Sequence, residues 1–150
     1  MSIFTKYKVE LIKEKSSRYS IDRKIKGPED VFKIAKEVLE IHKEPEEVLY
    51  VLALDIKSNV IGIHEVSRGS VSTSIVHPRE IMKRLILNNA AKFILIHNHP
   101  SNEVEPSNED KNVTDRLKDV GQIIGIELVD HVIIGDAYYS FKENNYDAIH

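Results

Sequence analysis

Two short apolar runs, VLYVLAL at Val48–Leu54 and KFILI at Lys92–Ile96, constrain the fold most strongly. Neither run alternates between apolar and polar residues, so both faces of each predicted strand must be covered by other parts of the protein. A chain of 150 residues, 41% hydrophobic and 30% charged, is long enough and apolar enough for one globular domain. We therefore expect one compact domain built around a central β-sheet.

The remaining elements follow from periodicity and from turn residues. A helix should start at Gly27-Pro28 and stop at Glu44-Pro45, and two more helices are expected at 78–88 and 107–124. Further strands are expected at Thr5–Lys13, Val60–Val66, Val71–Ile75, Glu127–Ile134 and Ala137–Phe141. This order predicts an α/β (α+β) protein with a single mixed β-sheet flanked by helices.

Composition excludes several classes of protein. The chain has no cysteine, so disulfides, thiolate metal sites and a cysteine nucleophile are excluded. No apolar run approaches the ~20 residues of a membrane span, and the N-terminus lacks the apolar core of a signal peptide. We therefore expect a cytoplasmic protein with no membrane partner.

Charge is unevenly distributed along the chain. Residues 1–26 carry eight Lys or Arg against three Asp or Glu, whereas residues 27–150 carry thirteen against twenty-one. We expect residues 1–26 to be a basic strand and linker within the same compact unit as residues 27–150. Such a segment could contact nucleic-acid phosphates, although most basic segments are solvated surface.

The stretch ILIHNHPSNEVEPSNED (94–110) contains the candidate chemistry. His97 and His99 alternate with Asn98 at a strand end, so their side chains point to the same face. Ser107 and Asp110 have the spacing of a helix capping box, which would hold the carboxylate rigidly in the first helical turn. Two imidazoles and one carboxylate suit a zinc site with an open position, whereas the serine–acid pair alone is typical of an ordinary helix start.

These residues resemble the JAMM motif of the MPN+ (JAB) zinc metallopeptidases, and the RadC-like branch is the more similar one. The likeness covers about residues 28–142. It is carried by SIVHPREI (74–81), HNHPS (97–101), PSNED (106–110) and LVDHVIIGD (128–136).

The resemblance implies a cytidine-deaminase-like, JAB/MPN-type fold for residues 27–150 and a role for each motif residue. It implies that His97, His99 and Asp110 bind Zn²⁺, and that Ser107 helps to hold the oxyanion. It places the catalytic glutamate on an upstream strand, and Glu65 in GIHEVSRGS is taken as that residue. His131 could be a hydrogen-bond partner of the site or an ordinary core histidine.

Three functional hypotheses remain at this stage. The first is a zinc-dependent hydrolase, a metallopeptidase or isopeptidase, that cleaves an amide bond in a peptide or protein substrate. The second is a DNA-repair-associated binding module with weak or no hydrolase activity. The third is a pseudo-enzyme that keeps the fold for protein contacts, and a homodimer is left open.

Overall fold

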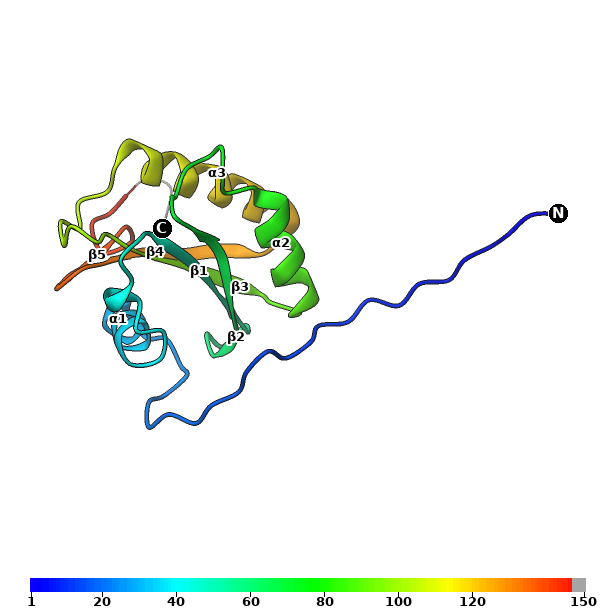
Figure 1. Cartoon of the computed structure of the whole chain (residues 1–150), viewed down its shortest axis with the longest axis horizontal. Coiled ribbons are helices and arrows are strands. Elements are labelled where there is room, and N and C mark those ends of the chain that lie inside the picture. The colour runs from blue at the N-terminus through cyan, green and yellow to red at the C-terminus, as the bar shows by residue number, and fades with distance from the viewer. Residues whose placement is uncertain (147–150) are drawn as a thin grey trace.

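The structure, a computed structural model, describes residues 1–146 and contains one mixed five-stranded sheet with the strand order β2-β1-β3-β4-β5 (Figure 1). The strands are β1 (Val48–Leu54), β2 (Val60–Arg68), β3 (Lys92–Asn98), β4 (Glu127–Ile134) and β5 (Tyr138–Ser140). The helices are α1 (Pro28–Glu37), the short 3-10 helix η1 (Ile41–Lys43), α2 (Pro78–Leu87) and α3 (Asn108–Ile124).

Strand pairing places β3 at the centre of the sheet. β3 runs antiparallel to β1 and parallel to β4, and the parallel pair is connected through α3. A parallel connection requires a crossover, so the chain leaves the end of β3, passes through α3 and returns to the start of β4. The end of β3 and the beginning of α3 are therefore close together.

Each face of the sheet has its own apolar core. On one face, α2 and α3 pack against alternate residues of β1 and β3, including Leu49, Val51, Phe93 and Leu95. On the other face, α1 packs against the residues in between, such as Leu52, Ile94 and Ile96, together with residues of β4. Both apolar runs are thus buried on both sides, as their lack of alternation predicts.

The fold class expected from the sequence is confirmed. The structure is a single mixed sheet flanked by helices, an α+β arrangement consistent with the JAB/MPN type. No helix within residues 1–146 has both the length and the apolar character required to cross a membrane. The first helix ends at Glu37, earlier than predicted, and the left-handed backbone of Glu40 (φ 51°) keeps it from continuing into η1.

Two predicted strands are wrong. The stretch 71–75 forms turns, because the Val76 N–H donates to the Ser72 carbonyl at 2.7 Å and both Val71 and Val76 are buried in the core. Thr5–Lys13 is extended and exposed but pairs with no strand in the described part of the chain. Figure 1 shows this segment running away from the folded body instead of packing within it.

Substitution of Gly121, near the end of α3, tests how closely the helix packs on the sheet. A Cβ at Gly121 would lie 2.5 Å from the Ile126 carbonyl oxygen and 3.2 Å from the Phe93 ring. Backbone must shift to relieve such a contact, so Gly121→Ala should lower the free energy of unfolding by about 1–3 kcal/mol in urea denaturation. The exposed neighbour Gln122 is the control, and Gln122→Ala should change stability by less than about 0.5 kcal/mol. Equal effects of the two substitutions would contradict this packing.

Candidate metal centre

The end of β3 carries both histidines on the face covered by α3. Phe93 and Leu95 belong to the core on that face, and alternation places His97 and then His99 in line with them. His99 lies beyond the last residue of the strand, but its N–H still donates to the Ile134 carbonyl of β4 at 2.9 Å. The backbone therefore holds both imidazoles at one edge of the sheet.

The first turn of α3 supplies the carboxylate. Ser107 is the N-cap and accepts the Asp110 N–H at 3.1 Å, while the Asp110 carboxylate accepts the Ser107 N–H at 2.8 Å. This is the capping box that the spacing predicts. Reciprocal bonding fixes the Asp110 side chain, which is buried and directed toward the two histidines.

Three electron-rich groups converge there. His97 Nε2 and His99 Nε2 are 3.0 Å apart. Asp110 Oδ1 lies 3.2 Å from His97 Nε2, and Asp110 Oδ2 lies 3.0 Å from His99 Nε2. The structure thus brings together the three residues expected to bind metal.

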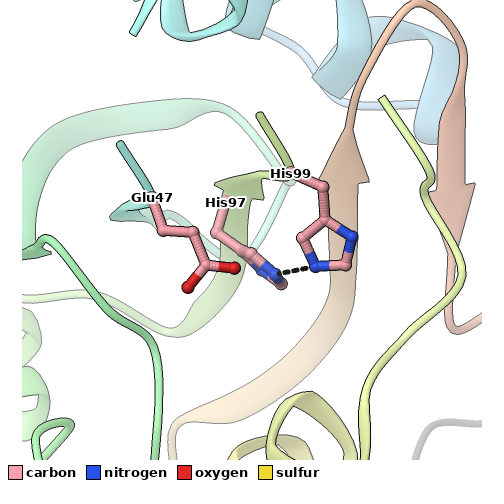
Figure 2. Close-up of side chains that lie close together, drawn as sticks. All are labelled: Glu47, His97 and His99. Carbon is pink, nitrogen blue, oxygen red and sulfur yellow. Dashed lines mark hydrogen bonds between the residues drawn. The ribbon is translucent and has the colours of Figure 1, made fainter. Parts of the chain in front are cut away.

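A second carboxylate, that of Glu47, lies beside the histidines. Glu47 directly precedes β1 and lies two residues before Leu49, so the two side chains are on the same face. Leu49 is the partner of His97 in the β1–β3 ladder. Its ligand atom and those of His97 and His99 lie within 4.8 Å of one another. Figure 2 shows the Glu47 carboxylate directed toward the His97 ring, and the Val71 N–H donates to its Oε2 at 3.2 Å.

A buried hydrogen-bond chain assigns the protonation of His97. The Thr114 hydroxyl donates its single hydrogen to the Asp110 carbonyl at 2.8 Å, so it must accept from His131 Nδ1 at 2.7 Å. A neutral His131 then has a bare Nε2, which accepts from His97 Nδ1 at 2.7 Å. His97 Nε2 is consequently the ring atom that presents a lone pair to the site.

His99 is oriented in a similar way. Its Nδ1 lies 2.6 Å from the Glu103 carbonyl oxygen, which can only accept, so Nδ1 carries a hydrogen and the neutral ring has its lone pair on Nε2. Two lone pairs and a carboxylate about 3 Å apart repel one another unless a positive charge lies between them. The cluster therefore has the chemistry of a cation site.

The pKa shifts describe the same cluster with protons, in place of a cation, between the rings and the Asp110 carboxylate. Complete burial, reinforced by the charge of His97, holds the pKa of His131 well below its ordinary value, so His131 is neutral. Burial alone would raise the pKa of Asp110, but hydrogen bonds with His97 and His99 lower it by more, and the carboxyl is ionised at neutral pH. Burial would lower the pKa of His99, but its bonds to Asp110 and Glu103 raise it overall.

The donor set fits zinc. Zinc accepts imidazole nitrogen and carboxylate oxygen, and catalytic zinc sites use three protein ligands. Zn–N distances of about 2.0–2.1 Å place tetrahedral ligands roughly 3.3 Å apart, close to the separations found here. His97, His99 and Asp110 could hold the ion, with Glu47 at the side of the same site.

The assignment of the catalytic glutamate to Glu65 requires correction. Glu65 pairs with Tyr50 in the β1–β2 ladder, and Tyr50 packs on the α1 side of the sheet, opposite the side that carries His97. The Glu65 carboxylate is bound by Arg68 instead. Glu47 is the glutamate that the structure brings to the histidines, and sequence analysis missed it.

Signals for Glu47 and His131 were present in the sequence but incomplete. Glu47 precedes a predicted buried strand, yet only the pairing of Leu49 with His97 reveals which neighbour it faces. His131 was left open between two roles, and its bonds to His97 and Thr114 show that it supports the site.

Comparison with known proteins identifies the family of the chain. Residues 25–146 match the model of the RadC-like JAB domain, and the chain belongs to that family. It is 49% identical over 125 residues to a UPF0758 protein of Clostridioides difficile (strain 630), covering 83% of this chain and 52% of the relative. A UPF0758 protein of Chlorobium phaeovibrioides (strain DSM 265 / 1930) is 42% identical over 137 residues, covering 91% of this chain and 60% of the relative. The chain thus spans about half the length of the curated relatives it matches.

Replacing Thr114 tests the hydrogen-bond chain. Thr114→Val removes the acceptor for His131 Nδ1–H, so His131 can place its hydrogen on Nε2 instead. His97 Nδ1 must then accept that hydrogen, and the His97 hydrogen moves to Nε2, where it blocks metal binding. Zinc affinity should fall roughly 10–100-fold in a competition titration with a chelating dye. Thr114→Ser keeps the hydroxyl and should bind zinc nearly as the parent does. Parent-like affinity of the valine variant would contradict the assigned tautomers.

Metal binding should depend on pH through His99. Because the pKa of His99 is raised, the ring is protonated up to a higher pH than usual, and a protonated ring cannot bind metal. Zinc affinity should therefore decrease from about pH 8 to about pH 6, with the decrease starting above the ordinary histidine pKa of about 6.5, and calorimetry should detect proton release on binding. His42 lies outside the site, so His42→Gln should leave this dependence unchanged. A zinc affinity that does not change across this pH range, with no proton release, would contradict the assignment.

Proposed function

We propose that this chain is a zinc-dependent hydrolase, a metallopeptidase or isopeptidase that cleaves an amide bond in a peptide or protein. One observation carries the proposal: the Nε2 lone pairs of His97 and His99 and the Asp110 carboxylate converge within about 3 Å, with the Glu47 carboxylate beside them. Membership of the RadC-like JAB domain family supports it.

Zinc, when bound, would lower the pKa of a water and polarise the substrate carbonyl. The role of Glu47 follows from its position. One carboxylate oxygen accepts the Val71 N–H, and the carboxylate is only half-buried, so its other oxygen can accept a proton from the attacking water. The same carboxylate would return that proton to the leaving amide nitrogen.

Ser107 is placed to interact with the attacked carbonyl. Its hydroxyl oxygen accepts the Asp110 N–H, and within residues 1–146 the hydroxyl donates to no other protein group. The side chain is exposed at the N-terminus of α3, next to the proposed metal ligands. The hydroxyl hydrogen could therefore be donated to the oxyanion that develops on the substrate, which is worth a few kcal/mol of barrier in comparable sites.

Separate substitutions distinguish zinc binding from turnover. Glu47→Gln should retain one zinc per chain, measured by elemental analysis, and should lose cleavage of a peptide library, measured by mass spectrometry of new termini. Asp110→Ala should lose both zinc and cleavage. Glu65→Gln is the matched control, because Glu65 lies on the opposite face, and it should retain both.

Two results would contradict the proposal. The first is an untreated parent protein that contains no metal and binds none when zinc is added. The second is Glu65→Gln abolishing cleavage while Glu47→Gln leaves it intact, which would return the catalytic role to Glu65.

A DNA-binding module remains the second candidate, and the exposure of the basic residues within 1–19 favours it. Phosphate contacts by this segment would make DNA affinity decrease steeply with salt concentration. Neutralising Lys6 and Lys8 should then reduce the salt dependence, and absence of DNA binding at low salt would remove this candidate.

A further inference from the structure

The first residues of the chain expose an unusual amount of apolar surface. Residues 1–19 are extended, and within the described chain no hydrogen bond joins them to the rest. Figure 1 shows this segment leaving the folded body. Six of its large apolar side chains are more than 70% exposed: Met1, Ile3, Phe4, Tyr7, Val9 and Ile12. Singly exposed apolar residues are common, but a contiguous set marks an interaction site.

The segment 3–13, which we call the N-terminal arm, has the pattern of a β-strand. Over residues 6–11, Tyr7, Val9 and Leu11 alternate with Lys6, Lys8 and Glu10, which gives this part of the arm one apolar side and one charged side. Ile, Phe, Thr, Tyr and Val, the residue types favoured in strands, make up much of the arm. A lone strand cannot satisfy its backbone or bury its apolar side, so it needs a sheet edge.

The outer edge of β2 is such an edge. β2 is the terminal strand of the sheet, and its outer side is paired only at its start, where Lys24 bridges Asn59 and the Val60 N–H donates to the Arg23 carbonyl at 2.8 Å. Over residues 61–68 no other described segment pairs with this side. An open edge of this length is a template for an added strand.

The charges of the N-terminal arm and of the β2 edge also favour contact between them. At the end of β2, Arg68 is shared by the carboxylates of Glu44, Glu46 and Glu65, so negative charge is in excess there. The charged side of the N-terminal arm is mainly basic, and residues 1–26 as a whole carry a charge of +5 against −8 for residues 27–150. Arm and edge are therefore complementary in charge as well as in backbone hydrogen bonding.

We propose that the N-terminal arm of one copy adds as a sixth strand to the β2 edge of a second copy, and that the exchange is reciprocal in a dimer. The direction of the chain favours a second copy over the arm's own sheet. Residues 23–25 already lie antiparallel to the start of β2, and continuing that ladder would place the polar residues 15–22 on the edge instead of the arm. In an exchange the extended chain reaches its partner without reversing, and domain swapping of this type gives symmetric dimers.

The apolar side argues against nucleic acid as the occupant. Phosphates would engage Lys6 and Lys8 but would leave Tyr7 and Val9 exposed to water. Strand addition uses both sides of the arm and its backbone.

Proline substitution tests the exchange. The mass of the full chain, measured by light scattering and sedimentation over a concentration series, should rise from monomer to dimer. Val9→Pro removes a backbone N–H and restricts φ in the middle of the arm, which disfavours strand pairing, and should weaken dimerisation about tenfold or more. Ser17→Pro makes the same change outside the arm and should leave dimerisation unchanged. Both residues are exposed, so neither substitution should affect folding of the body.

Hydrogen exchange locates the contact. Amides of residues 5–11, and those amides of β2 that point away from β1, should exchange slowly in the dimer and rapidly in dilute monomer. The proposal is overturned by a parent chain that stays monomeric at every concentration, by a dimer that Val9→Pro does not weaken, or by equal effects of Val9→Pro and Ser17→Pro. Slow exchange of the arm in the monomer would show that it occupies its own sheet, and salt-sensitive DNA binding by a chain that remains monomeric would assign the arm to DNA. Either result would also overturn the exchange.

Discussion

The repulsion among His97 Nε2, His99 Nε2 and the Asp110 carboxylate is the constraint on which the site depends. These atoms lie 3.0–3.2 Å apart at the end of β3, and the hydrogens of both rings are committed elsewhere, to His131 and to the Glu103 carbonyl. Such a cluster is stable only with a cation or a proton in its midst, because burial withholds the water that would otherwise solvate it. The folding energy of the surrounding strands and helix holds these groups together.

The architecture explains how distant residues reach one point. A parallel β3–β4 pair requires a crossover, and α3 begins next to the end of β3 with Asp110 locked by its capping box. β4 places His131 opposite Leu95, two residue pairs before His97 and on the same face, so its ring reaches His97 from the neighbouring strand. His131 stacks on Phe141, with ring centroids 4.8 Å apart, which fixes its orientation further. β1, on the other side of β3, delivers Glu47.

Local sequence patterns predicted many of these elements, but they did not predict which residues pair between neighbouring strands. The apolar runs predicted β1 and β3, and the spacing of Ser107 and Asp110 predicted the capping box that the structure contains. Glu65 was chosen and Glu47 missed because the register between strands decides which side chains share a face, and no local pattern encodes that register. A strand at Thr5–Lys13 was predicted from alternation alone, but a strand also requires a partner, and within residues 1–146 no segment pairs with it.

Anomalous diffraction at the zinc absorption edge, from crystals grown with zinc, tests the central claim most directly. The structure predicts one strong peak between His97 Nε2, His99 Nε2 and the Asp110 carboxylate, with Glu47 near its open side and Glu65 remote from it. The absence of a peak at this position, or zinc bound only at surface residues, would contradict the assignment of a metal centre.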